Sequence, residues 1–203
     1  MARRGDLLEF AALGVLHDSP LHGYELRKRL NAVLGSFRAI SYGSLYPCLK
    51  GLVARGLLVE QEDGGSGPAT MSRRARIVYA LTPDGKEYFA GLLGQAGPET
   101  WEDEPFTARL AFFGQTDAAV RLRILQGRRT RLEERLSLLR SSLGRTRERV
   151  DTYTQQLQQH GLDSVEREVR WLTELIEHEM SDSRTTRSTS TRQDPEQNPE
   201  GTS

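Results

Sequence analysis

Residues 41–57 read SYGSLYPCLKGLVARGL, and this stretch decides the fold. Apolar side chains recur in it at helical spacing: Leu45, Leu49, Leu52 and Val53. Gly56 follows at a place where a helix would end. A helix that buries one face and exposes tyrosines, serines and a lysine on the other suits the major groove of DNA. We expect Pro47 in the first turn, with the regular helix from about Ser44, because a proline there removes no hydrogen bond.

Two helices are predicted upstream of this stretch. Asp6 and Glu9 form a capping pair at the start of the nearly all-apolar run 7–16, which indicates a helix buried in a small core. A second helix is predicted from residue 21 or 22 to Leu34, with leucines on its inner side and basic residues on its outer side.

A short hairpin and a closing helix are predicted downstream. Strands are expected at residues 57–60 and 76–81, and the second alternates apolar and other residues as a half-buried strand does. Thr82 and Pro83 supply a helix N-cap followed by proline at the first helical position. Three helices, a two-stranded wing and a closing helix make a winged helix-turn-helix over residues 1–94.

The remaining sequence predicts a helical, coiled-coil-like dimerisation domain over residues 107–180, after a linker at 95–106. A long helix is expected from residue 117 to about 159, and a heptad repeat in it aligns apolar residues: Leu122, Leu125, Leu132, Leu136, Leu139, Leu143, Val150 and Leu157. Gly161 is expected to break this helix before a final one begins. Residues 181–203 lack large apolar side chains and are predicted to be disordered. The fold class is therefore mainly α.

Charge and cysteine content limit the classes of protein. The chain carries 28 Lys and Arg against 28 Asp and Glu, with 12 basic and 9 acidic residues in 1–94. This weakly basic front permits contact with nucleic acid without requiring it. The single cysteine excludes an intrachain disulfide. The N-terminal residues lack the apolar core of a signal peptide, and no apolar run approaches a membrane span. We therefore expect a cytoplasmic protein with no membrane partner.

Four motifs in residues 7–93 carry a resemblance to a known family. They are His22-Gly23-Tyr24-Glu25-Leu26, Ser44-Leu45-Tyr46-Pro47, Gly56-Leu57, and Tyr79-Ala80-Leu81-Thr82 between Arg76 and Gly85. In this order and spacing the chain resembles the PadR family of bacterial transcriptional regulators. The resemblance implies a winged helix-turn-helix DNA-binding domain followed by a variable helical dimerisation domain. It also implies repression of nearby genes, often relieved by a small molecule.

Eight side chains are candidates for DNA contact: Tyr24, Tyr42, Ser44, Tyr46, Lys50, Arg73, Arg74 and Arg76. Hydroxyls and a lysine on the recognition helix can reach phosphates and base edges. Arginines on a wing can reach the DNA backbone or the minor groove. Packing in the domain core is the alternative for Tyr24 and Tyr46, and a solvated surface is the alternative for the arginines.

Other kinds of site have weaker support. Cys48 could sense oxidants, although inert packing is favoured for an isolated cysteine. Trp101 and Trp171 are candidates for an effector pocket that takes a small aromatic molecule, with plain packing as the favoured alternative. The four histidines form no cluster at metal spacing, so neither a metal nor a cofactor is expected. No motif of an enzyme active site is present in the sequence.

We therefore expect a homodimeric, sequence-specific transcriptional repressor that binds a palindromic operator in double-stranded DNA and is not an enzyme. Two alternatives stay open. The chain could be a constitutive DNA-binding regulator without a ligand switch. It could also be a coiled-coil interaction module whose winged domain binds protein in place of DNA, which the balanced charge favours.

Overall fold

The computed structural model describes residues 4–34, 39–62, 77–146 and 151–190. The described chain is mainly helical with a small sheet, as the sequence predicts. It divides into two compact units, residues 1–124 and residues 125–203. The first unit runs past the predicted boundary at residue 94, because Ala108 and Phe112 are buried in the same core as the winged domain.

Helix α1 (Arg4–Asp18) occupies the middle of the first unit, and its residues 10–16 are all buried. Helix α1 contacts four other helices: α2 (Gly23–Leu34), α3 (Tyr42–Ala54), α4 (Pro83–Leu93) and α5 (Asp103–Leu110). The nearly all-apolar composition of α1 follows from this position, since neighbours cover it on several sides.

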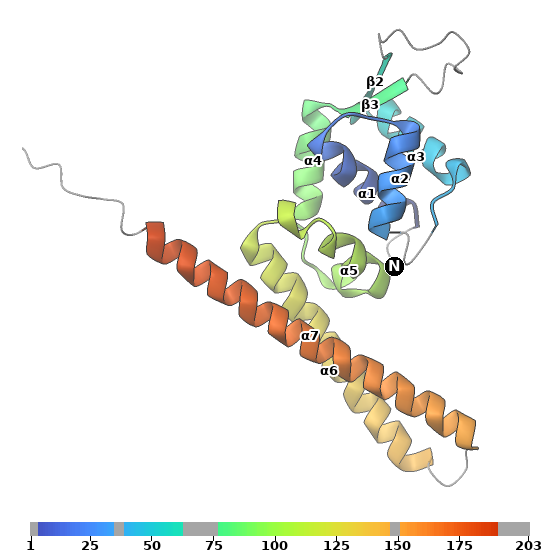
Figure 1. Ribbon diagram of the computed structural model, residues 1–203, viewed down its shortest axis with the longest axis vertical. Helices are drawn as coiled ribbons and strands as arrows, with labels where there is room; N and C mark the ends of the chain where they lie inside the picture. The colour runs from blue at the N-terminus through green and yellow to red at the C-terminus, as the bar shows by residue number, and fades with distance from the viewer. Residues whose placement is uncertain (1–3, 35–38, 63–76, 147–150, 191–203) are drawn as a thin grey trace, which may run out of the picture. The chain divides into compact units, whose positions relative to one another are not determined.

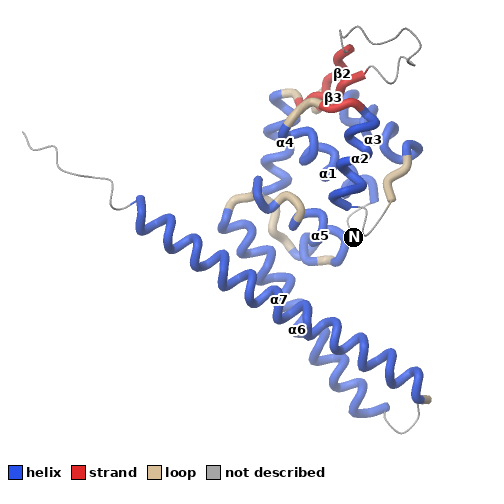
Figure 2. The backbone as a smooth tube through the Cα atoms, viewed as in Figure 1, coloured by secondary structure: helices blue, strands red, loops and turns tan. Residues whose placement is uncertain are grey.

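The three strands lie at one end of the first unit (Figure 2). Strands β1 (Leu21–His22), β2 (Leu58–Glu62) and β3 (Ile77–Leu81) form an antiparallel sheet in the order β1-β3-β2. Leu58 lies opposite Leu81, and Leu21 lies opposite Tyr79. The wing strands are predicted from the sequence, but β1 is not, because two residues are too few to show alternation. Helix α2 therefore begins at Gly23.

The predicted linker at residues 95–106 is partly helical, which corrects the prediction. A 3₁₀ turn spans Pro98–Trp101, and α5 begins at Asp103, inside the predicted linker. Asp103 and Glu104 lie in the first turn of α5, where the helix dipole favours negative charge. These two acidic residues of the predicted linker therefore belong to the start of a helix. A second 3₁₀ turn, Phe113–Gln115, follows α5.

The second unit is a helical hairpin of α6 (Ala118–Thr146), whose first turns belong to the first unit, and α7 (Thr152–Ser190). The two helices run side by side in opposite directions (Figure 1). Arg128 is 5% exposed, and its Nε and Nη2 donate to Oε1 of Glu168 at 2.9 and 2.7 Å. A charge this deeply buried needs such a partner. The ion pair therefore fixes how α6 and α7 face each other.

One continuous helix from residue 117 to 159 is predicted, and this prediction is wrong. Helix α6 ends at Thr146, and α7 begins at Thr152 after Asp151, whose Oδ1 accepts the backbone N–H groups of Tyr153 and Thr154 at 2.9 and 3.1 Å. Gly161, the expected helix breaker, lies within α7. A glycine costs a helix about 1 kcal/mol, an amount that packing along the rest of α7 can offset.

Packing within one chain accounts for part of the predicted heptad seam. Leu125, Leu132 and Leu136 are buried in the second unit together with Val165, Leu172 and Ile176 of α7. Leu122 and Leu139 are half-buried, and Leu157 is exposed. The side chain of Leu143 and the whole of Val150 lie outside the described residues. An antiparallel hairpin needs an apolar seam as much as a dimer does, so dimerisation through these residues stays a prediction.

Helix α7 continues to Ser190, so the predicted disorder from Ser181 onward is wrong for residues 181–190. The sequence contains no glycine or proline between residue 181 and Pro195, and extending an existing helix is much easier than starting one. Residues 191–203 lie outside the described part of the chain. None of the helices in the described ranges combines the length and apolar character that crossing a membrane requires.

Candidate nucleic-acid interface

Helices α2 and α3 form the helix-turn-helix, and hydrogen bonds fix the start of α3. Ser41 is the N-cap: its hydroxyl accepts the N–H of Ser44 at 3.3 Å, and the Ser44 hydroxyl donates to the Ser41 carbonyl at 3.0 Å. Asn31 on α2 accepts the N–H of Ile40 at 2.7 Å and donates to the Ile40 carbonyl at 3.4 Å. The two hydrogen bonds between Asn31 and the Ile40 backbone and the Ser41 cap together set the direction of α3 relative to α2.

Pro47 lies in the second turn of α3, where the sequence predicts the first turn. The Ser41 cap explains the difference, since it starts the helix at Tyr42, two residues before the predicted regular part. Proline has no N–H, so it removes the hydrogen bond that the carbonyl of Gly43 would otherwise accept. The recognition helix is therefore weakest in its first half.

The exposed side of α3 carries a stack of aromatic and basic groups. The rings of Tyr42 and Tyr46 are stacked, with centroids 5.7 Å apart and planes 17° from parallel. The guanidinium carbon of Arg27, on α2, lies 3.9 Å from the centroid of the Tyr42 ring. Lys50 is exposed one turn further along α3. We call Arg27, Tyr42, Tyr46 and Lys50 the aromatic–basic face.

The structure brings together three of the predicted DNA-contact residues. Tyr42, Tyr46 and Lys50 are spaced four residues apart and share one side of α3. Tyr24, at the start of α2, is 63% exposed. Ser44 lies on another side of α3, and its hydroxyl is engaged by the Ser41 cap.

The ring of Tyr46 lies against the start of α2. Tyr46 is half-buried, and its hydroxyl lies where a Cβ on Gly23 would approach it to 3.2 Å. Gly23 therefore leaves the space that the Tyr46 ring occupies against α2. The three wing arginines, Arg73, Arg74 and Arg76, lie outside the described residues.

Sequence reasoning misses two residues of this site. Arg27 reads as a general basic residue of α2, yet it lies over Tyr42, fifteen positions away in the sequence. Asn31 reads as one polar position on a helix, yet it holds the backbone of Ile40. Neither contact leaves a local pattern, because each depends on how the α2–α3 connection folds.

Replacing Asn31 by alanine is expected to lower the free energy of unfolding by about 1–2 kcal/mol, since the N–H of buried Ile40 loses its acceptor. Urea unfolding followed by circular dichroism measures the change. Lys28→Ala, on an exposed position of the same helix, is the control and should shift stability by less than about 0.5 kcal/mol. Equal unfolding midpoints for the two variants would contradict a stabilising role for the Asn31–Ile40 hydrogen bonds.

The C-terminal end of α3 is held by a second cluster. Nη1 of Arg55 donates to Oε2 of Glu9 on α1 at 2.7 Å, and the hydroxyl of Tyr88 on α4 donates to Oε1 of Glu9 at 3.1 Å. The Arg55 guanidinium also lies 4.9 Å from the centroid of the Tyr88 ring. The hydrogen bond to Glu9 raises the pKa of Arg55. Helix α3 is thus tied to α2 at its start and to α1 and α4 at its end.

The environment of Cys48 disfavours the oxidant-sensing alternative. Burial raises the pKa of its thiol to about 11, with the nearby charge of Glu9 as a second cause. The thiol is therefore neutral at physiological pH, and a neutral thiol reacts slowly with oxidants. Within the described ranges, no group of three or more His, Cys, Asp and Glu side chains is placed to hold a metal ion.

The two tryptophans lie in different units. Trp101 ends the 3₁₀ turn of the first unit, and Trp171 lies on α7 in the second, where it is partly exposed. An effector pocket formed by the two stays a prediction.

Residues 12–91 match the profile of the transcriptional regulator PadR-like family. No curated protein matches the sequence. Similar solved structures include Bacillus subtilis PadR in complex with operator DNA, which is 22% identical over 85% of this chain and 98% of that chain, with a TM-score of 0.40.

Two further structures are similar. Bacillus subtilis PadR in complex with p-coumaric acid is 22% identical over 85% of this chain and 98% of that chain, with a TM-score of 0.38. A PadR-like transcriptional regulator from Bacillus cereus is 20% identical over 86% and 99%, with a TM-score of 0.38.

The segment that matches the family profile contains the aromatic–basic face and the contacts at the start of α3. It runs from the middle of α1 into α4, and so includes α2, α3 and both wing strands. Members of this family are DNA-binding transcription regulators and not enzymes. Residues 12–91, which form most of the winged helix-turn-helix of this chain, match the PadR-like family of transcriptional regulators.

Proposed function

We propose that this regulator is a homodimeric, sequence-specific repressor that binds a palindromic operator. The aromatic–basic face of α3 is the observation that carries the proposal, because it lies on the second helix of the helix-turn-helix, the one that enters the major groove. Tyrosine hydroxyls can bond base edges and phosphates, and Lys50 can pair with phosphate. Two copies of this face would read two half-sites.

The second unit supports self-association. Among its described residues, five large apolar side chains are exposed: Leu138, Tyr153, Leu157, Trp171 and Met180. Tyr153 is 87% exposed, an unusual degree for an aromatic ring on a stable helix. Several exposed apolar side chains in one unit favour a protein–protein contact. A two-fold symmetric dimer is the commonest assembly of identical chains. A palindromic operator matches that symmetry.

A small-molecule switch is the third element of the proposal. A ligand that binds one arrangement of the dimer better than the other would weaken DNA binding by that difference in affinity. We expect the protein in the cytoplasm, where the DNA that it regulates lies.

The test is a mobility shift with the DNA upstream of the protein's own gene, at several salt concentrations. A coding fragment of equal length and base composition is the control. The upstream fragment should be retained at lower protein concentration, and its affinity should fall as salt rises, because phosphate contacts release counterions. No retention at the lowest salt would contradict the proposal and favour the protein-binding alternative.

Footprinting and sedimentation test the symmetry of the complex. We expect two protected half-sites centred about one helical turn of DNA apart, at roughly 10 base pairs, or a multiple of that spacing. Sedimentation of the free protein should give the mass of two chains. A monomer that protects a single half-site would contradict the dimer.

A further inference from the structure

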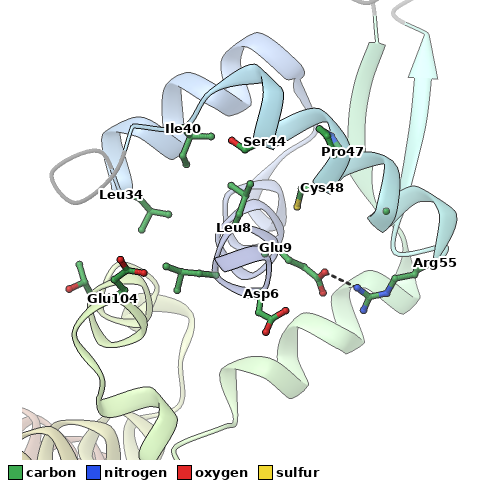
Figure 3. Close-up of a pocket in the computed structure, with 14 residues that line it drawn as sticks. Asp6, Leu8, Glu9, Leu34, Ile40, Ser44, Pro47, Cys48, Arg55 and Glu104 are labelled. Atoms are coloured by element: carbon green, nitrogen blue, oxygen red, sulfur yellow. Dashed lines mark hydrogen bonds and ion pairs between the residues drawn. The ribbon is translucent and has the colours of Figure 1, made fainter. Parts of the chain in front are cut away.

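A cavity of about 460 Å³ lies within the first unit, directly behind the recognition helix (Figure 3). One side of α3 forms its wall: Ser44, Pro47, Cys48, Gly51 and Arg55. These residues recur every three or four positions, so they lie along one stripe of the helix. The facing wall is made by the start of α1, the end of α2 and α5.

The cavity and the aromatic–basic face lie on different sides of the same helix. Tyr42 and Tyr46 lie two positions before Ser44 and Cys48 of the cavity stripe, and Lys50 lies two positions after Cys48. Two positions turn an α-helix by about 200°, so the two stripes point in nearly opposite directions. A molecule in the cavity would therefore touch α3 itself, on the side away from DNA.

The lining favours an apolar body. Leu8, Leu34, Ile40 and Pro47 contribute aliphatic surface to the cavity. The Cys48 thiol adds no charge at physiological pH, because burial raises its pKa to about 11. A cavity of this volume is within the range that binds small organic molecules, roughly 300–1,000 Å³.

The charged groups of the lining favour a cation. Three carboxylates lie there, those of Asp6, Glu9 and Glu104, against one guanidinium, that of Arg55. Arg55 is already paired with Glu9 at 2.7 Å. The lining is thus negative in sum, and its potential attracts cations and repels anions.

We propose that this cavity binds a small apolar organic cation, and that its occupation weakens DNA binding through α3. The second half of this proposal rests on the proposed function; the first half does not. A cation near Glu9 competes with Arg55 for that carboxylate, and the Glu9–Arg55 pair ties the end of α3 to α1. Loosening this tie changes the position of the recognition helix. The ligand and DNA then weaken each other's binding by the same factor.

Calorimetry without DNA tests the binding half on the full chain. The probe is tetraphenylphosphonium, and tetraphenylborate is the control, because it has nearly the same shape and the opposite charge. We expect one phosphonium per chain, bound about tenfold or more tighter than the borate. Equal affinity for the two ions would mean that they bind by unspecific apolar adsorption, and it would overturn the proposal.

A matched pair of glycine variants tests the location. Gly51 lines the cavity, and a Cβ built on it meets nothing within 4 Å, so Gly51→Leu adds an apolar side chain to the lining without a clash at its Cβ. Gly91, on α4, has equally open space and lines neither this cavity nor the DNA-facing side of α3. Gly51→Leu should weaken phosphonium binding by about tenfold or more, and Gly91→Leu should leave it unchanged. Unchanged binding by Gly51→Leu would overturn the assignment.

Two further measurements complete the test. In the mobility shift, phosphonium should weaken DNA binding of the parent by about fivefold or more and leave Gly51→Leu unaffected. No effect on the parent would overturn the coupling. A chain that fails to bind DNA even without phosphonium contradicts the proposed function, while calorimetry still reports on the cavity. If Gly51→Leu loses self-association in sedimentation, the cavity is a contact between copies and the proposal is wrong.

Discussion

Replacing Gly85 by alanine is expected to destabilise the first unit by about 3 kcal/mol, at the upper end of the usual cost of overpacking. Gly85 lies in the first turn of α4, and a Cβ on it would overlap the backbone carbonyl oxygen of Leu57 and approach Cδ2 of Leu81 to 2.8 Å. The Leu57 carbonyl accepts the N–H and the hydroxyl of Thr82, both at 3.2 Å. It cannot turn aside without losing these bonds, so α4 would have to move away from the wing.

Gly91→Ala is the control for this variant. Gly91 lies two turns further along α4, and a Cβ there meets nothing within 4 Å. Alanine is favoured over glycine in a helix by about 1 kcal/mol, so this variant should be as stable as the parent or more stable. The two substitutions are chemically identical and differ only in the space around them.

Tryptophan fluorescence during urea unfolding measures the difference. Trp101 belongs to the first unit and Trp171 to the second, so a Trp171→Phe background reports on the first unit alone. Gly85→Ala should lower the midpoint well below that of Gly91→Ala, with little change in slope. Equal midpoints would show that α4 does not pack tightly against the start of the wing.

The sequence predicts the first unit well because its signals are local. Thr82 caps its helix as expected, and the apolar spacing of Leu45, Leu49 and Leu52 marks the buried side of α3. The same spacing places Tyr42, Tyr46 and Lys50 on the other side. What it does not reveal is the role of Ser44, since the hydroxyl of a residue near a helix start can serve the cap as readily as DNA.

The second unit is predicted less well, because its pattern is compatible with more than one partner. A heptad seam requires another helix, but it does not say whether that helix belongs to the same chain. Leu125, Leu132 and Leu136 are buried in a hairpin with α7. The buried pair of Arg128 and Glu168 is likewise invisible in the sequence, since forty positions separate the two residues. Both facts depend on where the chain reverses between α6 and α7.

Removing Tyr42 and Lys50 together, as Tyr42→Ala with Lys50→Ala, is expected to weaken binding to the upstream DNA by about a hundredfold or more. Each contact of this kind is worth about 1–3 kcal/mol. The two residues lie eight positions apart on α3, so their effects should be nearly additive. A total of about 2.8 kcal/mol corresponds to a factor of about 100.

The single variants separate the two roles. Lys50→Ala should lower the slope of log affinity against log salt by about 0.9, because one phosphate contact is lost, whereas Tyr42→Ala removes no charge and should leave the slope unchanged. The guanidinium of Arg27 rests on the Tyr42 ring, and we expect it to stay clear of the phosphates when that ring is removed. An increase in slope for Tyr42→Ala would therefore assign Arg27 a phosphate contact. Lys86→Ala, exposed on α4, is the charge-matched control. If the double variant binds DNA like Lys86→Ala, the interface does not lie on this side of α3.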